Sequence, residues 1–152
     1  SLSAEAEQPG FMPDKFESGT LNIPGIAGLS EGIEYILQKG TDSIFKYTAS
    51  LIECLVYNLS KIPGIRIYAA KEKKRQGGVI SFTVKNFSAG EIAERLDERN
   101  ISVRSGMHCA PLAHKTVGTS NGTVRVSVSS FTTEDEILEF VSEIRKISRI
   151  KN

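Results

Sequence analysis

The stretch Val79-Ile-Ser-Phe-Thr-Val-Lys-Asn-Phe-Ser-Ala-Gly-Glu-Ile-Ala-Glu-Arg-Leu96 decides the fold of this 152-residue chain. Its first part alternates apolar and polar residues, a pattern typical of a strand with one buried face. Its second part opens with Ser88-Ala-Gly-Glu91, a capping box that predicts a helix through Asn100. The stretch therefore predicts a strand and a helix whose apolar sides share a core, and the core-facing residues are Ile80, Phe82, Val84, Ile92 and Leu96.

The segments on both sides of this stretch add three helices and three strands. Two helices precede it, at about 24–40 and 41–61, and a last helix follows Thr133. The other segments with strand character are 65–69, 101–104 and 123–129. Because helices and strands do not strictly alternate, we predict an α+β fold, with a small, mostly antiparallel sheet of about four strands packed against helices.

Apolar residues at helical spacing mark one side of each flanking helix. In the first helix they are Ile26, Leu29, Ile33, Ile36 and Leu37. In the second and last helices the inward positions are Ile44, Tyr47, Leu51, Leu55, Leu59, Ile137, Phe140, Val141, Ile144 and Ile147. Cys54 lies beside the second of these stripes, so we expect it to be a buried, inert thiol.

Composition argues for one ordinary soluble domain. The formal charge is +1, which gives no support for nucleic-acid or membrane binding. No apolar stretch approaches the roughly 18–20 residues that span a bilayer. Two cysteines make no disulfide framework, and we expect a reduced, cytoplasmic compartment. Residues 1–16 are polar and broken by proline and glycine, which predicts a linker or tail.

A second stretch, Arg104-Ser-Gly-Met-His-Cys-Ala-Pro-Leu-Ala-His114-Lys115, carries the densest chemistry. It places a cysteine beside histidine and near two cations, in a loop between two predicted strands. A thiol in such surroundings is stabilised as the reactive thiolate. The loop therefore favours a nucleophilic or sulfur-carrying role for Cys109.

Three other interpretations of this loop stay open. Cys109 could be a structural residue of a surface loop. His108, Cys109 and His114 could bind zinc, although adjacent ligands suit a tetrahedral ion poorly and no fourth ligand is evident, so we predict no metal. A Cys/His hydrolase would need an imidazole at the sulfur. Adjacent residues of an extended chain point in opposite directions, which makes His108 a weak base and His114 the alternative.

The last strand presents an arginine away from the core. In Thr123-Val-Arg-Val-Ser-Val-Ser129 the valines share one face, and Arg125 shares the other with three hydroxyl residues. A guanidinium held on a strand suits bidentate binding of a carboxylate or phosphate. The alternative is an arginine on a solvated sheet face.

Three blocks of this sequence resemble the cysteine desulfurases and selenocysteine lyases, class V enzymes of the aminotransferase fold that depend on pyridoxal phosphate (PLP). The blocks are Phe16-Glu-Ser-Gly-Thr-Leu-Asn-Ile-Pro-Gly-Ile-Ala-Gly-Leu29, Arg104-Ser-Gly-Met-His-Cys-Ala110 and Thr123-Val-Arg-Val-Ser127. They occur in the order found in the C-terminal, small domain of that family. The resemblance covers about residues 11–151.

The resemblance implies a role for each matching residue. A cysteine in the family's loop attacks the sulfur of PLP-bound L-cysteine, becomes a persulfide and releases alanine, and this cysteine corresponds to Cys109. The sulfur then passes to an acceptor protein for iron–sulfur cluster or thiocofactor assembly. Arg125 corresponds to the arginine that binds the substrate carboxylate, and Arg104 is a second expected substrate-binding residue.

Four further residues match the family's active-site region. Gly106 and His108 belong to the loop motif, and Thr20 and Asn22 belong to a block that lies near the active site. Leu21 departs from the proline that the family usually has there.

The resemblance also implies that the cofactor site lies outside this chain. The family's PLP lysine occurs in a Ser-x-His-Lys segment of the large domain, and His114-Lys115 matches only its end, in the wrong context. The chain starts with Ser1 rather than methionine. We therefore expect 1–16 to be a linker or the end of the large domain and 17–152 the C-terminal domain, which alone would neither bind PLP nor turn over cysteine.

The expected partners of the full-length enzyme are L-cysteine or L-selenocysteine, a sulfur-acceptor protein and a second subunit in a homodimer. Two alternative functions remain. One is another class V aminotransferase or lyase, although amino transfer needs no thiol. The other is a stand-alone module that carries persulfide or binds protein.

Overall fold

The computed structural model describes residues 7, 9–17 and 19–150, and it divides the chain into two compact units, 1–41 and 42–152. In the first unit, a 3-10 turn, η1 (Asp14–Phe16), precedes helix α1 (Ile23–Lys39). The Asn22 side chain caps α1 by accepting a hydrogen bond from the Gly25 amide at 3.1 Å. The predicted apolar stripe of α1 is exposed along its whole length, and α1 has no buried residue.

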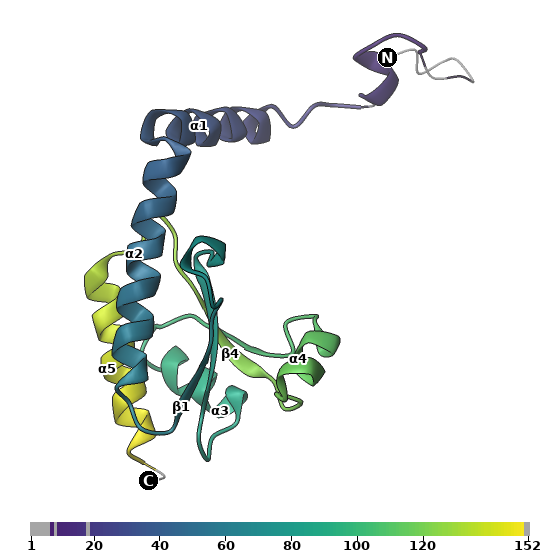
Figure 1. Cartoon of the computed structure of the whole chain (residues 1–152). Helices are drawn as coiled ribbons and strands as arrows, with labels where there is room; N and C mark the ends of the chain where they lie inside the picture. The colour runs from purple at the N-terminus through teal and green to yellow at the C-terminus, as the bar shows by residue number, and fades with distance from the viewer. Residues whose placement is uncertain (1–6, 8, 18, 151–152) are drawn as a thin grey trace. The chain divides into compact units, whose positions relative to one another are not determined.

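The second unit is an α+β domain, as predicted (Figure 1). Its helices and turns are α2 (Thr41–Ser60, which begins at the boundary of the units), η2 (Lys73–Arg75), α3 (Ala89–Asp97), α4 (Pro111–Val117) and α5 (Glu134–Ser148). Its strands are β1 (Ile65–Tyr68), β2 (Val79–Val84), β3 (Arg104–Gly106) and β4 (Thr123–Ser127). The strands form one sheet in the order β1-β2-β4-β3, and every neighbouring pair is antiparallel.

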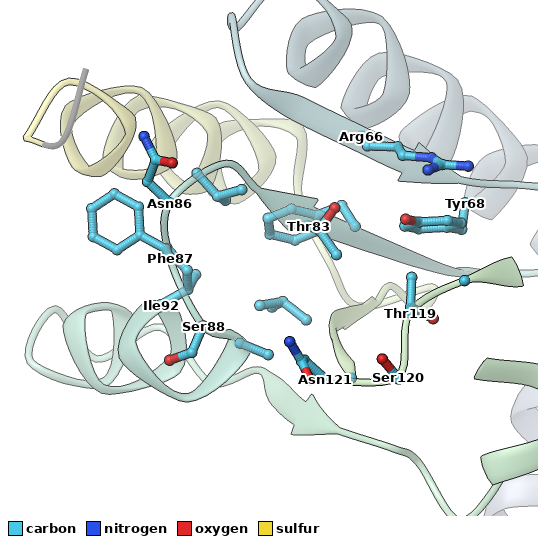
Figure 2. Close-up of a pocket in the computed structure, with 16 residues that line it drawn as sticks. Arg66, Tyr68, Thr83, Asn86, Phe87, Ser88, Ile92, Thr119, Ser120 and Asn121 are labelled. Carbon is cyan, nitrogen blue, oxygen red and sulfur yellow. The ribbon is translucent and has the colours of Figure 1, made fainter. Parts of the chain in front are cut away.

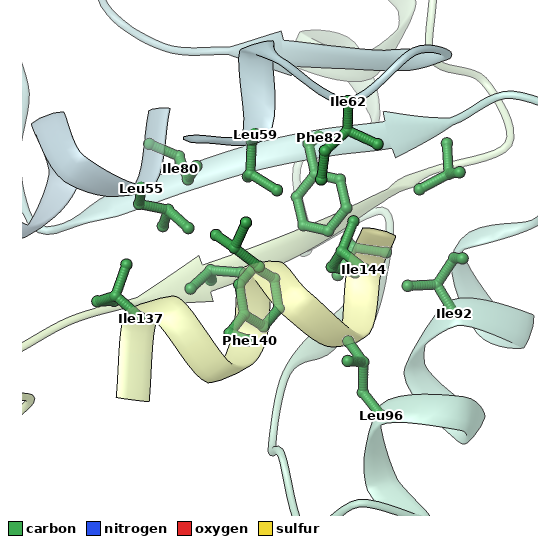
Figure 3. Close-up of a cluster of buried hydrophobic side chains, with 14 of the residues drawn as sticks. Leu55, Leu59, Ile62, Ile80, Phe82, Ile92, Leu96, Ile137, Phe140 and Ile144 are labelled. Carbon is green, nitrogen blue, oxygen red and sulfur yellow. The ribbon is translucent and has the colours of Figure 1, made fainter. Parts of the chain in front are cut away.

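One face of this sheet forms the hydrophobic core with the helices. Phe82 is fully buried and meets Phe140 of α5 edge to face, with ring centroids 6.0 Å apart. Figure 3 shows side chains of α2, the sheet, α3 and α5 meeting around this pair. The predicted core residues Leu51, Leu55, Leu59, Ile80, Phe82, Val84, Ile92, Leu96, Ile137, Phe140, Val141, Ile144 and Ile147 are all buried.

The predicted helix starts are confirmed in detail. Ser88 and Glu91 form the capping box of α3, and Thr133 and Glu136 form a second one at α5. Each box satisfies amide groups that have no partner within their own helix. Helix α3 ends at Asp97, three residues earlier than predicted.

Four predictions need correction. The third strand is Arg104–Gly106 rather than 101–104, because Ile101 and Val103 pack on the core while ladder pairing begins only at Arg104. Helix α4 was predicted as loop. Tyr47 is 42% exposed rather than buried, although its hydroxyl donates to the carbonyl of Thr132 at 2.7 Å. Cys54 is half-buried, and the Asn58 amide contacts its sulfur at 3.5 Å.

Within the described part of the chain, no helix has both the length and the apolarity needed to cross a membrane.

Candidate active site

The strand register places two arginines side by side on the face of the sheet opposite the core. Arg125 of β4 is paired with Ser81 of β2 on one side and with Arg104 of β3 on the other. Val124, the chain neighbour of Arg125, and its strand partner Phe82 are buried in the core. Arg125 and its strand partner Arg104 therefore project from the opposite face. This face is therefore where the predicted binding residues meet.

Neither guanidinium group forms an ion pair with a carboxylate in the part of the chain that the structure describes. None of the ion pairs among the described residues involves Arg104 or Arg125. The Nε atom of Arg125 is buried without a hydrogen-bond partner in the same part of the chain. Like charges on directly opposite strand positions repel each other. An anion bound between them would remove this repulsion and give both groups an acceptor.

Cys109 lies in a tight turn that follows β3. Gly106, His108 and Cys109 all have positive φ, at 106°, 52° and 58°. The turn closes through a hydrogen bond from the Ala110 amide to the Met107 carbonyl at 2.9 Å. Two consecutive non-glycine residues in the left-handed region cost about 1–3 kcal/mol each, so surrounding contacts must hold them there. The extended backbone assumed for His108 and Cys109 in the sequence analysis is therefore wrong.

Arg104 contacts the cysteine directly. The Cys109 side chain is exposed, and its Sγ accepts a hydrogen bond from Nη2 of Arg104 at 3.4 Å. The contact holds the guanidinium of Arg104 at the sulfur atom. Arg104 thus contacts the thiol of Cys109 and is also the strand partner of Arg125.

His108 fastens the turn to the sheet. Its Nε2 lies 3.0 Å from the hydroxyl of Thr123, which is 2% exposed at the start of β4. Burial lowers the pKa of His108 below 6.5, and the positive charges of Arg125, His114 and Arg104 lower it further. The imidazole is consequently neutral at pH 7. Its Nδ1 is buried and has no partner among the described residues.

His114 is a structural residue of α4. It is 6% exposed, its Nδ1 lies 2.8 Å from the hydroxyl of Thr119, and its ring packs 5.5 Å from that of His108. The only side-chain hydrogen bond at the Cys109 sulfur in the described part of the chain comes from Arg104. These contacts do not support the idea that His114 acts as a base on Cys109. The described residues include no cluster of three or more metal-ligating side chains.

Two parts of this arrangement were missed from the sequence. Gly122 lies against the backbone of Gly106, and an added Cβ would come within 2.7 Å of it. Helix α4 starts at Pro111 and is followed by Gly118 in the left-handed conformation. Proline at the first turn and glycine just past the end are the signal that could have identified this helix.

A polar cavity of about 630 Å³ lies on the other side of the turn that carries Gly122. Figure 2 shows Thr119, Ser120 and Asn121 of this turn facing Arg66, Tyr68 and Thr83 of the sheet. Cys109, Arg104 and Arg125 do not line it. Arg104 and Cys109 are exposed, and Arg125 is half-buried. Thr20 and Asn22 belong to the first unit, where Asn22 caps α1.

Lys115, the lysine that follows the cysteine loop, is exposed on α4. The charged donors of this face are guanidinium groups, which suit an acid group such as a carboxylate or a phosphate.

Comparison with known proteins relates this arrangement to one family. A model of the class V aminotransferases matches residues 3–140. The chain is 34% identical over 138 residues to a probable cysteine desulfurase of Xylella fastidiosa, covering 91% of this chain and 32% of that protein. It is 38% identical over 129 residues to a probable cysteine desulfurase of Methanothermobacter thermautotrophicus, covering 83% and 32%.

The fold of the chain is also similar to that of a solved cysteine desulfurase structure. The apo structure of a cysteine desulfurase from Thermococcus onnurineus NA1 matches with a TM-score of 0.82 at 34% identity, over 90% of this chain and 34% of that one. The chain spans about a third of the length of these relatives.

Proposed function

The chain belongs to the class V aminotransferase family, and from this premise we propose that it is the C-terminal part of a PLP-dependent cysteine desulfurase. In this proposal residues 1–16 connect to the large domain and 17–152 form the small one. The observation that carries it is the contact of the Cys109 sulfur with Arg104, beside an Arg125 whose buried Nε has no hydrogen-bond partner among the described residues. A nucleophile next to an unfilled acid-binding position suits a small amino acid with sulfur on its side chain.

Cys109 takes the sulfur of the substrate. Its thiolate attacks the substrate sulfur, an S–S bond forms, and the carbon–sulfur bond breaks with its electron pair moving to carbon. Carbon then takes up a proton, so the thiol and L-cysteine become the persulfide and L-alanine. PLP held by the remainder of the enzyme supplies the electron sink for breaking that bond. Arg104 stabilises the negative charge on the Cys109 sulfur before attack.

Arg125 holds the substrate carboxylate. It lies in the middle of a strand that is paired on both sides, so its Cα is fixed by the sheet. A bidentate contact with a carboxylate would satisfy its unpaired Nε and offset the repulsion from Arg104. Thr20 and Asn22 stay predicted active-site residues of the full-length enzyme, from their match to the family's sequence block.

His108 positions the nucleophile without touching the substrate. Its hydrogen bond to Thr123 holds the left-handed turn that presents Cys109. Because the imidazole is neutral at pH 7, it adds no further positive charge beside the two arginines. The exposed position of Cys109 would also let a sulfur-acceptor protein reach the persulfide.

The test uses the protein extended upstream to its natural start and supplied with PLP. Alanine and persulfide formed from L-cysteine are measured for wild type, Cys109→Ser and Cys54→Ser. We expect Cys109→Ser to lose persulfide formation and Cys54→Ser to retain it. Persulfide formation by Cys109→Ser at the wild-type rate would rule out this nucleophile. PLP binding without alanine production would move the function to another class V reaction.

A second candidate function is supported by the exposure of Cys109 outside any described cavity. As a stand-alone carrier, the 152-residue chain would accept sulfur from a small persulfide without a cofactor. Incubation with cysteine persulfide, followed by mass spectrometry, tests this. A rapid gain of one sulfur atom at Cys109, slowed in Arg104→Ala, would favour the carrier. Equal labelling of Cys54 and Cys109 would show only general thiol reactivity.

A further inference from the structure

An apolar groove lies on the outer side of α2, away from the candidate active site. Its floor is formed by α2 side chains and its wall by the loop that joins β1 to β2, and its volume is about 570 Å³. The floor residues are Phe45, Ala49, Ile52, Val56 and Tyr57. Phe45 is 47% exposed and Tyr57 is 62% exposed. Two large aromatic side chains are thus presented to solvent along one hollow.

The wall of the groove has a fixed shape. The Gln76 side chain accepts a hydrogen bond from the Ala70 amide at 2.7 Å, and it donates to the carbonyls of Gly77 and Val79 at 2.9 and 2.6 Å. One side chain therefore closes the loop at both of its ends. Lys73 of η2 ties the loop to α2 through an ion pair with Glu53 at 3.0 Å. A groove whose walls are already ordered loses little conformational entropy when a ligand binds.

The rim of the groove is positively charged. The loop carries Lys71, Lys73, Lys74 and Arg75 within five residues, and Lys73 and Lys74 line the groove itself. Two nearby carboxylates already form ion pairs with these cations. Glu53 pairs with Lys73, and Glu72 contacts Lys74 at 3.7 Å and Arg75 at 3.5 Å. Lys61 adds a cation at the far side of Tyr57, 3.6 Å from the ring centroid. Positive charge therefore exceeds negative charge around an apolar floor.

We propose that this groove binds an acidic segment of another protein, one that inserts one or two large apolar side chains between Phe45 and Tyr57. Exposed aromatic residues provide the anchoring contacts that are typical of protein interfaces. The lysines around them select for carboxylates and speed association. A nucleic acid would match the charge, but it would leave the alanine, isoleucine and valine of the floor without apolar partners. This proposal does not depend on the chemistry of Cys109.

The test is a nuclear magnetic resonance titration of the 152-residue chain with two short synthetic peptides. Both carry the same apolar anchors, and one is rich in glutamate while the other is rich in lysine. We expect the acidic peptide to shift amide signals of residues 45–57 and 69–76. We expect its affinity to fall by at least about fivefold when salt rises from about 0.05 to 0.3 M. No shift with the acidic peptide, or equal shifts with both peptides, would overturn the proposal.

Charge reversal gives the sharper control. The double variant Lys73→Glu/Lys74→Glu should weaken the acidic peptide about tenfold or more and should gain affinity for the basic one. Both lysines are more than four-fifths exposed, so their replacement has little effect on stability. The matched variant Lys85→Glu/Lys115→Glu changes the net charge equally at exposed positions that do not line the groove, and should bind as wild type.

Peptide binding by Lys85→Glu/Lys115→Glu shows whether affinity depends on the charge at the groove or on the net charge of the chain. An equal loss of binding in both double variants would show attraction by net charge and would overturn the docking site. Sedimentation of the chain without peptide tests the other occupant, a second copy. Self-association that Lys73→Glu/Lys74→Glu abolishes would assign the groove to a homodimer and overturn the proposed acidic partner.

Discussion

The two faces of the four-stranded sheet carry different kinds of side chain, although the same strands form both. On the core face, Phe82 and Val124 are buried and belong to the hydrophobic cluster. On the other face, Ser81 and Arg125 occupy the adjacent positions, and Arg104 and Arg125 lie next to each other without an ion pair to any described carboxylate. The core face lowers the free energy of the fold. The open face retains repulsion that only a bound anion would relieve.

The largest expected difference between the faces is in stability. Phe82→Ala should lower the free energy of unfolding by about 3–5 kcal/mol, because it removes a fully buried ring that contacts Phe140. Arg125→Ala should change it by less than about 0.5 kcal/mol, since no ion pair is lost. Urea unfolding followed by circular dichroism measures both. A cost of several kcal/mol for Arg125→Ala would show that this arginine supports the fold.

Substrate binding should show the reverse order. In the enzyme extended to its natural start, Arg125→Ala should weaken binding of the substrate by about 2–4 kcal/mol, the loss of a charge-assisted bidentate contact. The measurement is the Michaelis constant for L-cysteine. The Arg66→Ala variant is the matched control, because Arg66 lies on edge strand β1 and stacks on Tyr68 at 5.1 Å. An unchanged Michaelis constant in Arg125→Ala would remove the assigned role.

Gly122 lies just before β4 and packs against the backbone of Gly106, at the start of the cysteine loop. Gly122→Ala should cost about 1–2 kcal/mol or more, because φ is +81° and the new Cβ would lie 2.7 Å from the Gly106 backbone. Relief of this contact would displace the start of the cysteine loop, so the alkylation rate of Cys109 should change as well. Gly118→Ala has a positive φ of 73° but no such contact, and it serves as the control. If both variants lose the same free energy of unfolding, the positive φ alone explains the destabilisation and the contact with Gly106 does not contribute.

A smaller effect is expected at the hydrogen bond between His108 and Thr123. Thr123→Val keeps the shape of the side chain but leaves the imidazole nitrogen without a partner, at a cost of about 1 kcal/mol. The alkylation rate of Cys109 should change because the turn loses its attachment to β4. Thr83→Val on the neighbouring strand is the control for the loss of a hydroxyl. If the two variants alkylate at the same rate as wild type, His108 does not position the cysteine.

The smallest effect is a dependence of stability on pH. The pKa of His108 is lowered in the folded state, so the unfolded state binds more protons between that lowered value and 6.5. The stabilisation is complete above about pH 6.5 and is lost as pH falls through the folded pKa. Urea unfolding at several pH values should show a slope in this window that is smaller in His108→Asn. An identical slope in that variant would assign the dependence to other groups.

The fold was largely predictable because its signals are local. Alternation identified the buried side of β2, and the capping boxes at Ser88 and Thr133 marked two helix starts. The short helix α4 has no apolar stripe long enough to reveal a period, so it was missed. The shift of β3 arose because Ile101 and Val103 have strand propensity, yet they pack on the core before the ladder begins.

The candidate site was predictable only as a set of residue types. The spacing of Cys109 and Arg104 placed a thiol near a cation, but the contact depends on two left-handed residues that no periodic pattern reveals. The bond between His108 and Thr123 joins residues 15 positions apart and depends on the pairing of β3 with β4. The register of the strands therefore determines which side chains of the site are in contact. This register could not be predicted from a single sequence.

The absence of buried residues in α1 has a consequence for hydrogen exchange. A helix of 17 residues without tertiary packing is only marginally stable in water. Its amide protons should exchange with solvent within the time of mixing, whereas those of β2 and β4 should exchange only through global unfolding. The chain would then melt as two events, an early gradual loss of helix signal followed by one cooperative transition. Helix α1 would in this way contribute to the helix signal at low temperature without contributing to the cooperative melting transition.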